Sequence, residues 1–196
     1  MNPLGIMPVF MTMTDSLDKE ERRQTAKKAN IVAAITLILF AFSGQLLFKF
    51  FGISVNSFRM VGGIIFFMMG WDMLQAKLVK VKMNKKSVNK EYVDDISVTP
   101  LAIPMICGPG AITNAIVLME DAQTIQMKGI LIGSILLVCL IGYLVLWSSG
   151  KITIWLGETG NKIMMRLMGL IVMVIAVEFF FSGLKPILID ILNAQA

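Results

Sequence analysis

The chain has 196 residues, of which 56% are hydrophobic and only 16% carry a charge. Soluble domains are usually about a quarter charged, and here the charged residues lie between long apolar blocks instead of along amphipathic helices. This segregation excludes an ordinary soluble fold and predicts an all-α integral membrane protein whose partner is the lipid bilayer. The net charge of +5 lies in loops, without interleaved aromatic residues, so no nucleic-acid partner is predicted.

Residues that usually carry catalysis or bind metals are scarce. The chain has no histidine, which excludes His-based metal sites and His general bases. Cys107 and Cys139 both lie inside apolar stretches, where packing is the expected role rather than a disulfide. No phosphate-binding loop of the G-x-x-x-x-G-K type is present. We therefore expect no metal, no cofactor and no ATP drive within this chain.

Six hydrophobic stretches follow one another along the chain. A membrane helix needs about 20 apolar residues, and all stretches but the first are long enough. We predict six transmembrane helices in two repeats of three, residues 1–76 and 98–184, with a Lys-rich loop at 77–97 and a tail at 185–196. The stretches run from about 1 to 13, 30 to 51, 57 to 74, 98 to 119, 128 to 149 and 164 to 183.

The positive charges alternate between successive connections. The first, third and fifth connections are basic, whereas the second and fourth carry no Lys or Arg. Since cytoplasmic loops are enriched in Lys and Arg, this pattern predicts that the basic loops are cytoplasmic and that both termini lie outside. The basic residues are Lys19, Arg22, Arg23, Lys27 and Lys28, then Lys77, Lys80, Lys82, Lys85, Lys86 and Lys90, and finally Lys151 and Lys162.

Two sequence matches occur at nearly the same offset. Asn2-Pro3-Leu4-Gly5 matches Gly108-Pro109-Gly110-Ala111 at an offset of 106, and the segments that begin at Phe58 and Met165 match at 107. Each of the latter opens an apolar span with Arg and has Gly three residues later. Because each half has three spans, the halves must sit in the membrane with opposite orientations. The sequence therefore predicts inverted repeats, an architecture of secondary transporters.

The first stretch is shorter than the repeat requires. Apolar residues precede Gly108 in the second half, but only Met1 precedes Asn2, and about eleven residues after Pro3 cannot cross about 30 Å of hydrocarbon. We expect that the natural protein has roughly ten to fifteen further residues at its N-terminus. The alternative is a re-entrant half-helix that begins in mid-membrane.

The first and fourth helices are both predicted to be broken. Asn2-Pro3 combines an N-cap residue with proline at the first helical position, and Gly108-Pro109-Gly110 has the same pattern. Each restarted helix leaves free N–H groups and a positive dipole end in the membrane, which suit a carboxylate. The alternative is a pair of proline kinks stabilised by neighbouring helices. The predicted substrate-binding residues are Asn2, Pro3, Gly5, Gly108, Pro109, Gly110, Ala111, Thr113 and Asn114.

Four charged residues fall within or at the ends of spans. Arg59 and Arg166 open the third and sixth spans, where snorkelling to the interface is the favoured interpretation. Asp72 lies near the cytoplasmic end of the third span, so an interfacial position is again favoured. Glu178 lies well inside the sixth span and is a candidate proton carrier. Glu178 and Asp72 are thus the candidate ion-coupling residues.

Three motifs carry a family resemblance. They are Asn2-Pro3-Leu4-Gly5-Ile6-Met7-Pro8, the stretch from Phe58 that ends Trp71-Asp72-Met73-Leu74, and Ala102-Ile103-Pro104-Met105-Ile106-Cys107-Gly108-Pro109-Gly110-Ala111-Ile112-Thr113. Over essentially the whole chain these motifs resemble the MarC family of bacterial and archaeal membrane proteins, grouped with small neutral amino-acid transporters in the LysE-type superfamily. The resemblance implies six helices, a plasma (inner) membrane location in a prokaryote and transport of glycine- or alanine-sized substrates.

The sequence departs from the family pattern in two places. Family members usually carry an apolar stretch before the Asn-Pro motif, which this sequence lacks. The position of Glu178 more often holds Gln, which weakens an obligatory proton role for Glu178.

The leading hypothesis is therefore a secondary transporter of small neutral amino acids, coupled to protons or another ion. A non-transporting membrane stress or scaffold protein remains an alternative. A membrane-embedded enzyme is disfavoured, because the spans offer only Asp72, Glu178 and scattered Ser and Thr. The chain is expected not to be an enzyme, and a homo-oligomer is compatible with the sequence.

Overall fold

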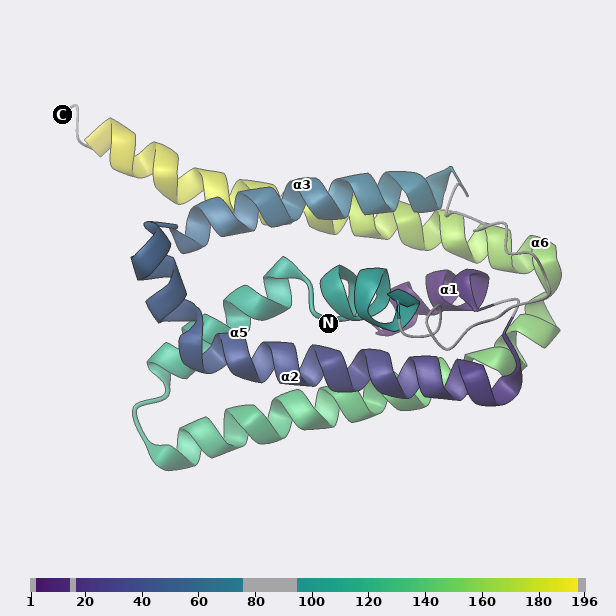
Figure 1. The fold of residues 1–196 in the computed structure, drawn as a ribbon. Coiled ribbons are helices and arrows are strands. Elements are labelled where there is room, and N and C mark those ends of the chain that lie inside the picture. Colours follow the sequence, from purple (N-terminus) through teal and green to yellow (C-terminus); the bar gives the residue numbers. More distant parts are fainter. Residues whose placement is uncertain (1–2, 15–16, 76–94, 194–196) are drawn as a thin grey trace.

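The computed structural model describes residues 3–14, 17–75 and 95–193, and every regular element in these ranges is helical (Figure 1). Asn2 and most of the Lys-rich loop predicted at 77–97 lie outside the described residues. The elements are α1 (Pro3–Met13), α2 (Lys19–Phe51), α3 (Val55–Leu74), η1 (Ser97–Ile106), α5 (Pro109–Asp121) and α6 (Ile125–Asn193).

Element α6 consists of two helical arms. Gly157 has φ of 65° and ψ of −178°, outside the helical region, and separates a first arm (Ile125–Ser149) from a second arm (Thr159–Asn193). A positive φ is readily adopted by glycine because glycine has no Cβ. The chain turns back after the first arm, so the two arms lie on opposite sides of the molecule (Figure 1).

Several described helices are long and apolar enough to cross a membrane. They are α2, α3 and the two arms of α6, and a fifth span arises if η1 and α5 are counted as one bent span. The prediction of an all-helical membrane protein is therefore confirmed, whereas six crossings remain a prediction. Helix α1 has 11 residues, about 16 Å at 1.5 Å per residue, which is about half of the hydrocarbon thickness.

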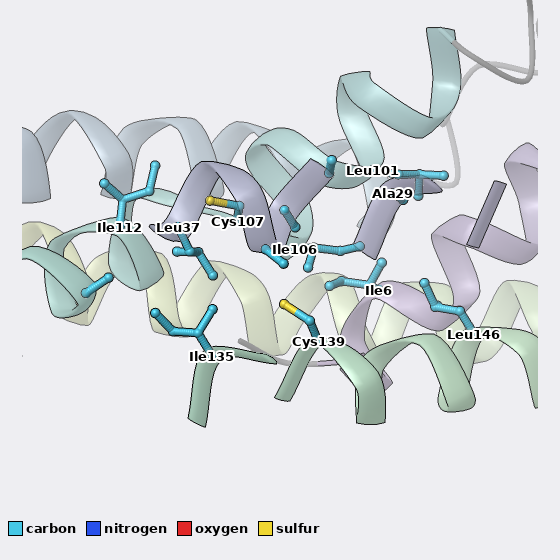
Figure 2. Packing of buried hydrophobic residues seen from close by; sticks show 14 of the residues in the cluster. Ile6, Ala29, Leu37, Leu101, Ile106, Cys107, Ile112, Ile135, Cys139 and Leu146 are labelled. Carbon is cyan, nitrogen blue, oxygen red and sulfur yellow. The ribbon is translucent and has the colours of Figure 1, made fainter. Parts of the chain in front are cut away.

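The helices form three layers. Helix α3 lies along the second arm of α6, α2 lies along the first arm, and α1, η1 and α5 lie between these pairs (Figure 1). The main buried cluster contains small and apolar residues of α1, α2, η1, α5 and the first arm of α6, and Figure 2 shows Leu37, Ile106 and Ile135 among them. Cys107 and Cys139 are both buried in this core as free cysteines.

Helix α3 and the second arm of α6 approach one another very closely. A Cβ atom added at Gly63 would lie 2.8 Å from the carbonyl oxygen of Ala176. A Cβ atom added at Gly70 would likewise lie 2.8 Å from the carbonyl oxygen of Gly169. Small residues are common where membrane helices pack backbone to backbone. Gly63, Gly70 and Gly169 therefore allow α3 and the second arm of α6 to pack this closely.

Two helix boundaries differ from the predicted spans. Helix α2 begins at Lys19 instead of about residue 30, because Asp18 and Glu21 form a capping box with N–H···O distances of 2.8 and 2.9 Å. The second arm of α6 continues to Asn193, beyond the predicted end at 183, through a further apolar segment that includes Pro186.

Candidate functional site: a cavity at the bend between η1 and α5

The chain bends sharply between η1 and α5. The two helices meet at Cys107 and Gly108 with an angle of 60° between them. Helix α5 starts with Pro109 in its first turn, after Gly108 in an extended conformation. A Cβ atom at Gly108 would overlap the ring of Phe66 and would lie 2.7 Å from the carbonyl oxygen of Pro104. Only glycine fits at this bend without displacing its neighbours.

The start of α5 offers backbone donors to the surrounding space. The first α-helical hydrogen bond runs from the N–H of Ile112 to the carbonyl of Gly108, at 3.0 Å. The N–H groups of Gly110 and Ala111 lie before the first α-helical hydrogen bond and so have no partner within the helix. Pro109 has no N–H, and no side chain caps this helix end. The site therefore combines backbone N–H donors that have no acceptor within the helix with the positive end of a helix dipole, and both suit an anionic group.

A cavity of about 320 Å³ lies beside this bend. It brings together five of the predicted binding residues, which come from α1 and from the η1–α5 bend. The remaining lining residues come mainly from α3 and the second arm of α6. The predicted residues in the lining are Gly5, Gly108, Gly110, Ala111 and Asn114, and the others are Ile6, Phe66, Met69, Met73, Met105, Ile106, Val172, Ile175 and Phe179.

The other predicted binding residues do not line this cavity. Pro3 lines a separate small cavity of about 10 Å³, together with Asn30 of α2. Pro109 is buried against Gly62. Thr113 is fully buried, and its hydroxyl has no hydrogen-bond partner among the described residues. Asn2, predicted to cap α1, lies outside the described residues.

The α3 and α6 lining residues were not identified from the sequence. Three of them lie on α3 and three on α6, and each set has the spacing i, i+3, i+7 of one helix face. The two sets are also offset by 106, the same offset that relates Asn2-Pro3 to Gly108-Pro109. The sequence match between these two spans has an offset of 107, which does not pair these residues, so the offset of 106 becomes visible only in the packed structure. The matched pairs are Phe66 with Val172, Met69 with Ile175, and Met73 with Phe179.

The same offset relates the close contacts between α3 and α6. Adding 106 to Gly63 gives Gly169, and adding 106 to Gly70 gives Ala176. The contact between Gly63 and Ala176 therefore corresponds to the contact between Gly70 and Gly169, with the partners exchanged. Residues of α3 and α6 that are 106 apart thus take part in the same pair of close contacts.

The candidate ion-coupling residues lie outside the cavity. Asp72 and Glu178 are exposed, and neither lines the cavity. Arg59 is half-buried and Arg166 is exposed. Within the described ranges, no group of three or more His, Cys, Asp or Glu residues could bind a metal ion. The arrangement at the bend can thus hold a small molecule by backbone donors, one amide side chain and apolar contacts.

Comparison with known proteins identifies the family. The model of the "MarC family integral membrane protein" matches residues 1–188. A UPF0056 membrane protein of Pyrococcus horikoshii is 42% identical over 94% of this chain and 88% of its own length. One from Methanocaldococcus jannaschii is 39% identical over 96% of this chain and 92% of its own length.

A bacterial relative extends the comparison. The UPF0056 membrane protein YhcE of Escherichia coli is 36% identical over 98% of this chain and 90% of its own length. No solved structure matches. The apolar helices and the family match agree, and the resemblance noted in the sequence is confirmed. The chain belongs to the MarC family of integral membrane proteins.

Proposed function

We propose that this chain is a secondary transporter of small neutral amino acids and that the cavity beside the bend is its substrate site. In this proposal the chain is a multi-pass protein of a prokaryotic plasma membrane, with both termini outside. It binds and moves its substrate, such as glycine or alanine, without chemical change, so no catalytic residue is assigned.

The observation that carries the proposal is the composition of the cavity wall. The lining takes matched residues from α3 and the second arm of α6, and it takes Gly5 of α1 and Ala111 of α5, which are also 106 apart. Such matched contributions support two repeats of opposite orientation that meet at the substrate site, as in other secondary transporters. Rocking of one repeat against the other would then expose the cavity to each side of the membrane in turn.

The polar groups at the bend suit an amino-acid carboxylate. In the proposed complex the N–H groups of Gly110 and Ala111 donate to the carboxylate at the positive end of α5. Asn114 is the one polar side chain among the lining residues, and its amide oxygen is an acceptor for the substrate ammonium group. The glycines at 108 and 110 place no side chain of their own beside these donors.

Transport in liposomes tests this proposal. The full chain is reconstituted, and uptake of labelled glycine and alanine is measured with and without a pH gradient. We expect uptake above that of empty liposomes. In Gly110→Val, the added Cβ atom alone would lie 3.3 Å from the Phe179 ring, and the rest of the side chain would enter the cavity. We therefore expect uptake to fall about tenfold or more.

Gly133→Val is the matched control. It makes the same change on the first arm of α6, where no atom lies within 4 Å of an added Cβ, and it should leave uptake unchanged. If the folded, unmodified protein gives no uptake above empty liposomes, the transporter proposal is wrong and a stress or scaffold role gains support. If Gly110→Val and Gly133→Val show equal uptake, the substrate does not bind in the cavity beside the bend.

A further inference from the structure

We infer that the cavity is built for an amino acid with an apolar side chain of three or four carbons or their equivalent, such as valine, leucine or methionine, in preference to glycine or alanine. This inference rests on the proposed function of neutral amino-acid transport and moves its preferred substrates from glycine and alanine to larger apolar amino acids. The structural basis is the chemistry and size of the cavity wall.

Most of the cavity wall is apolar. Of the fourteen lining residues, ten have apolar side chains, three are glycines and one is Asn114. The apolar side chains include Met69 and Met73 of α3 and Ile175 of α6, whereas no charged residue lines the cavity. A serine-like or charged side chain would therefore lose hydrogen bonds to water without gaining partners.

Polar and apolar groups lie on different elements around the cavity. The backbone donors and Asn114 belong to the start of α5, while the large apolar side chains come mainly from α3 and α6. Rings from those two helices flank the bend, because Phe66 lies against Gly108 and Phe179 lies against Gly110. A substrate whose charged end is held at the bend would direct its side chain toward the apolar residues that α3 and the second arm of α6 contribute to the wall.

The cavity volume exceeds what the smallest amino acids need. The volume of about 320 Å³ equals about ten water molecules at their share of liquid volume. Glycine has five heavy atoms and would leave water against the methionine, isoleucine and phenylalanine side chains. Leucine and methionine have nine heavy atoms each and would displace most of that water. Each additional buried methylene raises affinity about fourfold.

The methionines indicate tolerance among apolar side chains. Met69, Met73 and Met105 are unbranched and polarizable, so they adapt to ligands of different shape. Phe66 and Phe179 are more rigid and limit the width of the cavity at the bend. We therefore expect similar affinities for leucine and methionine, both higher than that for alanine.

Competition in proteoliposomes provides the test. Uptake of labelled alanine by the full, unmodified chain is measured against increasing unlabelled glycine, serine, leucine and methionine. Leucine and methionine should inhibit at concentrations about tenfold or more below that needed for serine. If leucine and methionine compete no better than serine, the inference is overturned while the transporter proposal stands. If no alanine uptake occurs, calorimetric titrations of the full chain with leucine and with glycine decide: tighter binding of leucine supports the inference, and equal or no binding of leucine overturns it.

A variant pair locates the side-chain subsite. Ile175 and Leu170 are both exposed residues of the same arm, but only Ile175 lines the cavity, so Ile175→Phe enlarges the cavity wall and Leu170→Phe is the matched control. We expect Ile175→Phe to raise the concentration of leucine needed for half-inhibition about tenfold and to change that for glycine less than about twofold. Leu170→Phe should match the unmodified chain for both. An equal effect of Ile175→Phe on leucine and glycine would contradict this placement.

Discussion

Asp72 and Glu178 are acids at corresponding positions of α3 and the second arm of α6, 106 residues apart. The contacts Gly63–Ala176 and Gly70–Gly169 have their midpoint near residue 66 on α3 and near residue 173 on α6. Each acid lies about 8 Å along its helix from that midpoint. Both side chains are exposed and lie outside the cavity.

Glu178→Gln tests whether the acid contacts the substrate. Because Glu178 does not line the cavity, we expect the half-saturating alanine concentration for exchange to change less than about twofold. The measurement is alanine counterflow without a pH gradient, with Asp190→Asn as the control at an exposed acid near the end of the same arm. A large loss of affinity would place Glu178 in the substrate site.

The same variant also tests the coupling role predicted from the sequence. If Glu178→Gln keeps counterflow but loses stimulation by a pH gradient, the carboxyl carries the coupling proton. If a pH gradient stimulates Glu178→Gln as much as Asp190→Asn, the Glu178 carboxyl does not carry the coupling proton. A parallel Asp72→Asn variant shows whether the corresponding acid of α3 behaves alike.

Sequence reasoning found the backbone part of the candidate site but missed most of its side chains. Gly108 and Gly110 were found because a Gly-Pro-Gly motif inside an apolar span has few structural uses. Met69, Ile175 and Phe179 look like ordinary membrane-helix residues, and only tertiary packing turns them toward the cavity. Thr113 was predicted to bind substrate, but helix rotation places it in the core instead.

At the scale of elements, the packing of α3 against the second arm of α6 depends on glycine. A Cβ atom at Gly169 would lie 2.7 Å from the carbonyl oxygen of Gly70 and 2.7 Å from the backbone nitrogen of Leu74. Backbone atoms cannot move aside as the end of a side chain can. We therefore expect Gly169→Val to separate the helices and lower the free energy of unfolding by about 1–3 kcal/mol.

Thermal unfolding of the detergent-solubilised protein measures this effect. Gly129→Val is the control, because an added Cβ at Gly129 has no atom within 4 Å. The control should unfold at or slightly above the temperature of the unmodified chain, since valine has a higher helix propensity than glycine. Equal unfolding temperatures for Gly169→Val and Gly129→Val would show that α3 and α6 are not packed as closely as described.

Element boundaries were predicted less well than element types. The predicted third span, 57–74, and the observed helix Val55–Leu74 agree closely, because a turn with Gly52 and the cap Ser54 defines its start. The predicted start of α2 was wrong, because the apolar criterion ignores the charged first turns that precede the membrane. The Asp18 and Glu21 spacing, a capping-box pattern, carried that information in the sequence.

At the scale of the whole molecule, the helical membrane class followed from composition, but the arrangement of helices around the cavity did not. The offsets of 106 and 107 predicted two related halves, while the face that each helix turns inward depends on long-range contacts. Close contacts at Gly63 and Gly70 select the offset of 106 for α3 and α6. Two related halves thus remain a prediction from the sequence, whereas the offset of 106 for α3 and α6 comes from the packed structure.

Membrane orientation is the remaining whole-molecule prediction. The basic residues in the first turns of α2, such as Lys19 and Lys27, favour a cytoplasmic position for that end of the helix bundle. The turn with Ile53 and the connection with Gln123 carry no Lys or Arg and should face outside. Single cysteines at these positions can report the orientation because both native cysteines, Cys107 and Cys139, are buried.

Labelling of intact cells with a membrane-impermeant maleimide tests the orientation. We expect Ile53→Cys and Gln123→Cys to be labelled before the membrane is opened, because both positions are exposed in short connections. Lys19→Cys and Lys27→Cys should be labelled only after permeabilisation, and the unmodified chain measures the background from native cysteines. If Lys19→Cys is labelled in intact cells and Ile53→Cys is not, the orientation is the reverse of the predicted one. It would also place the basic end of α2 outside, against the charge bias that underlies the prediction.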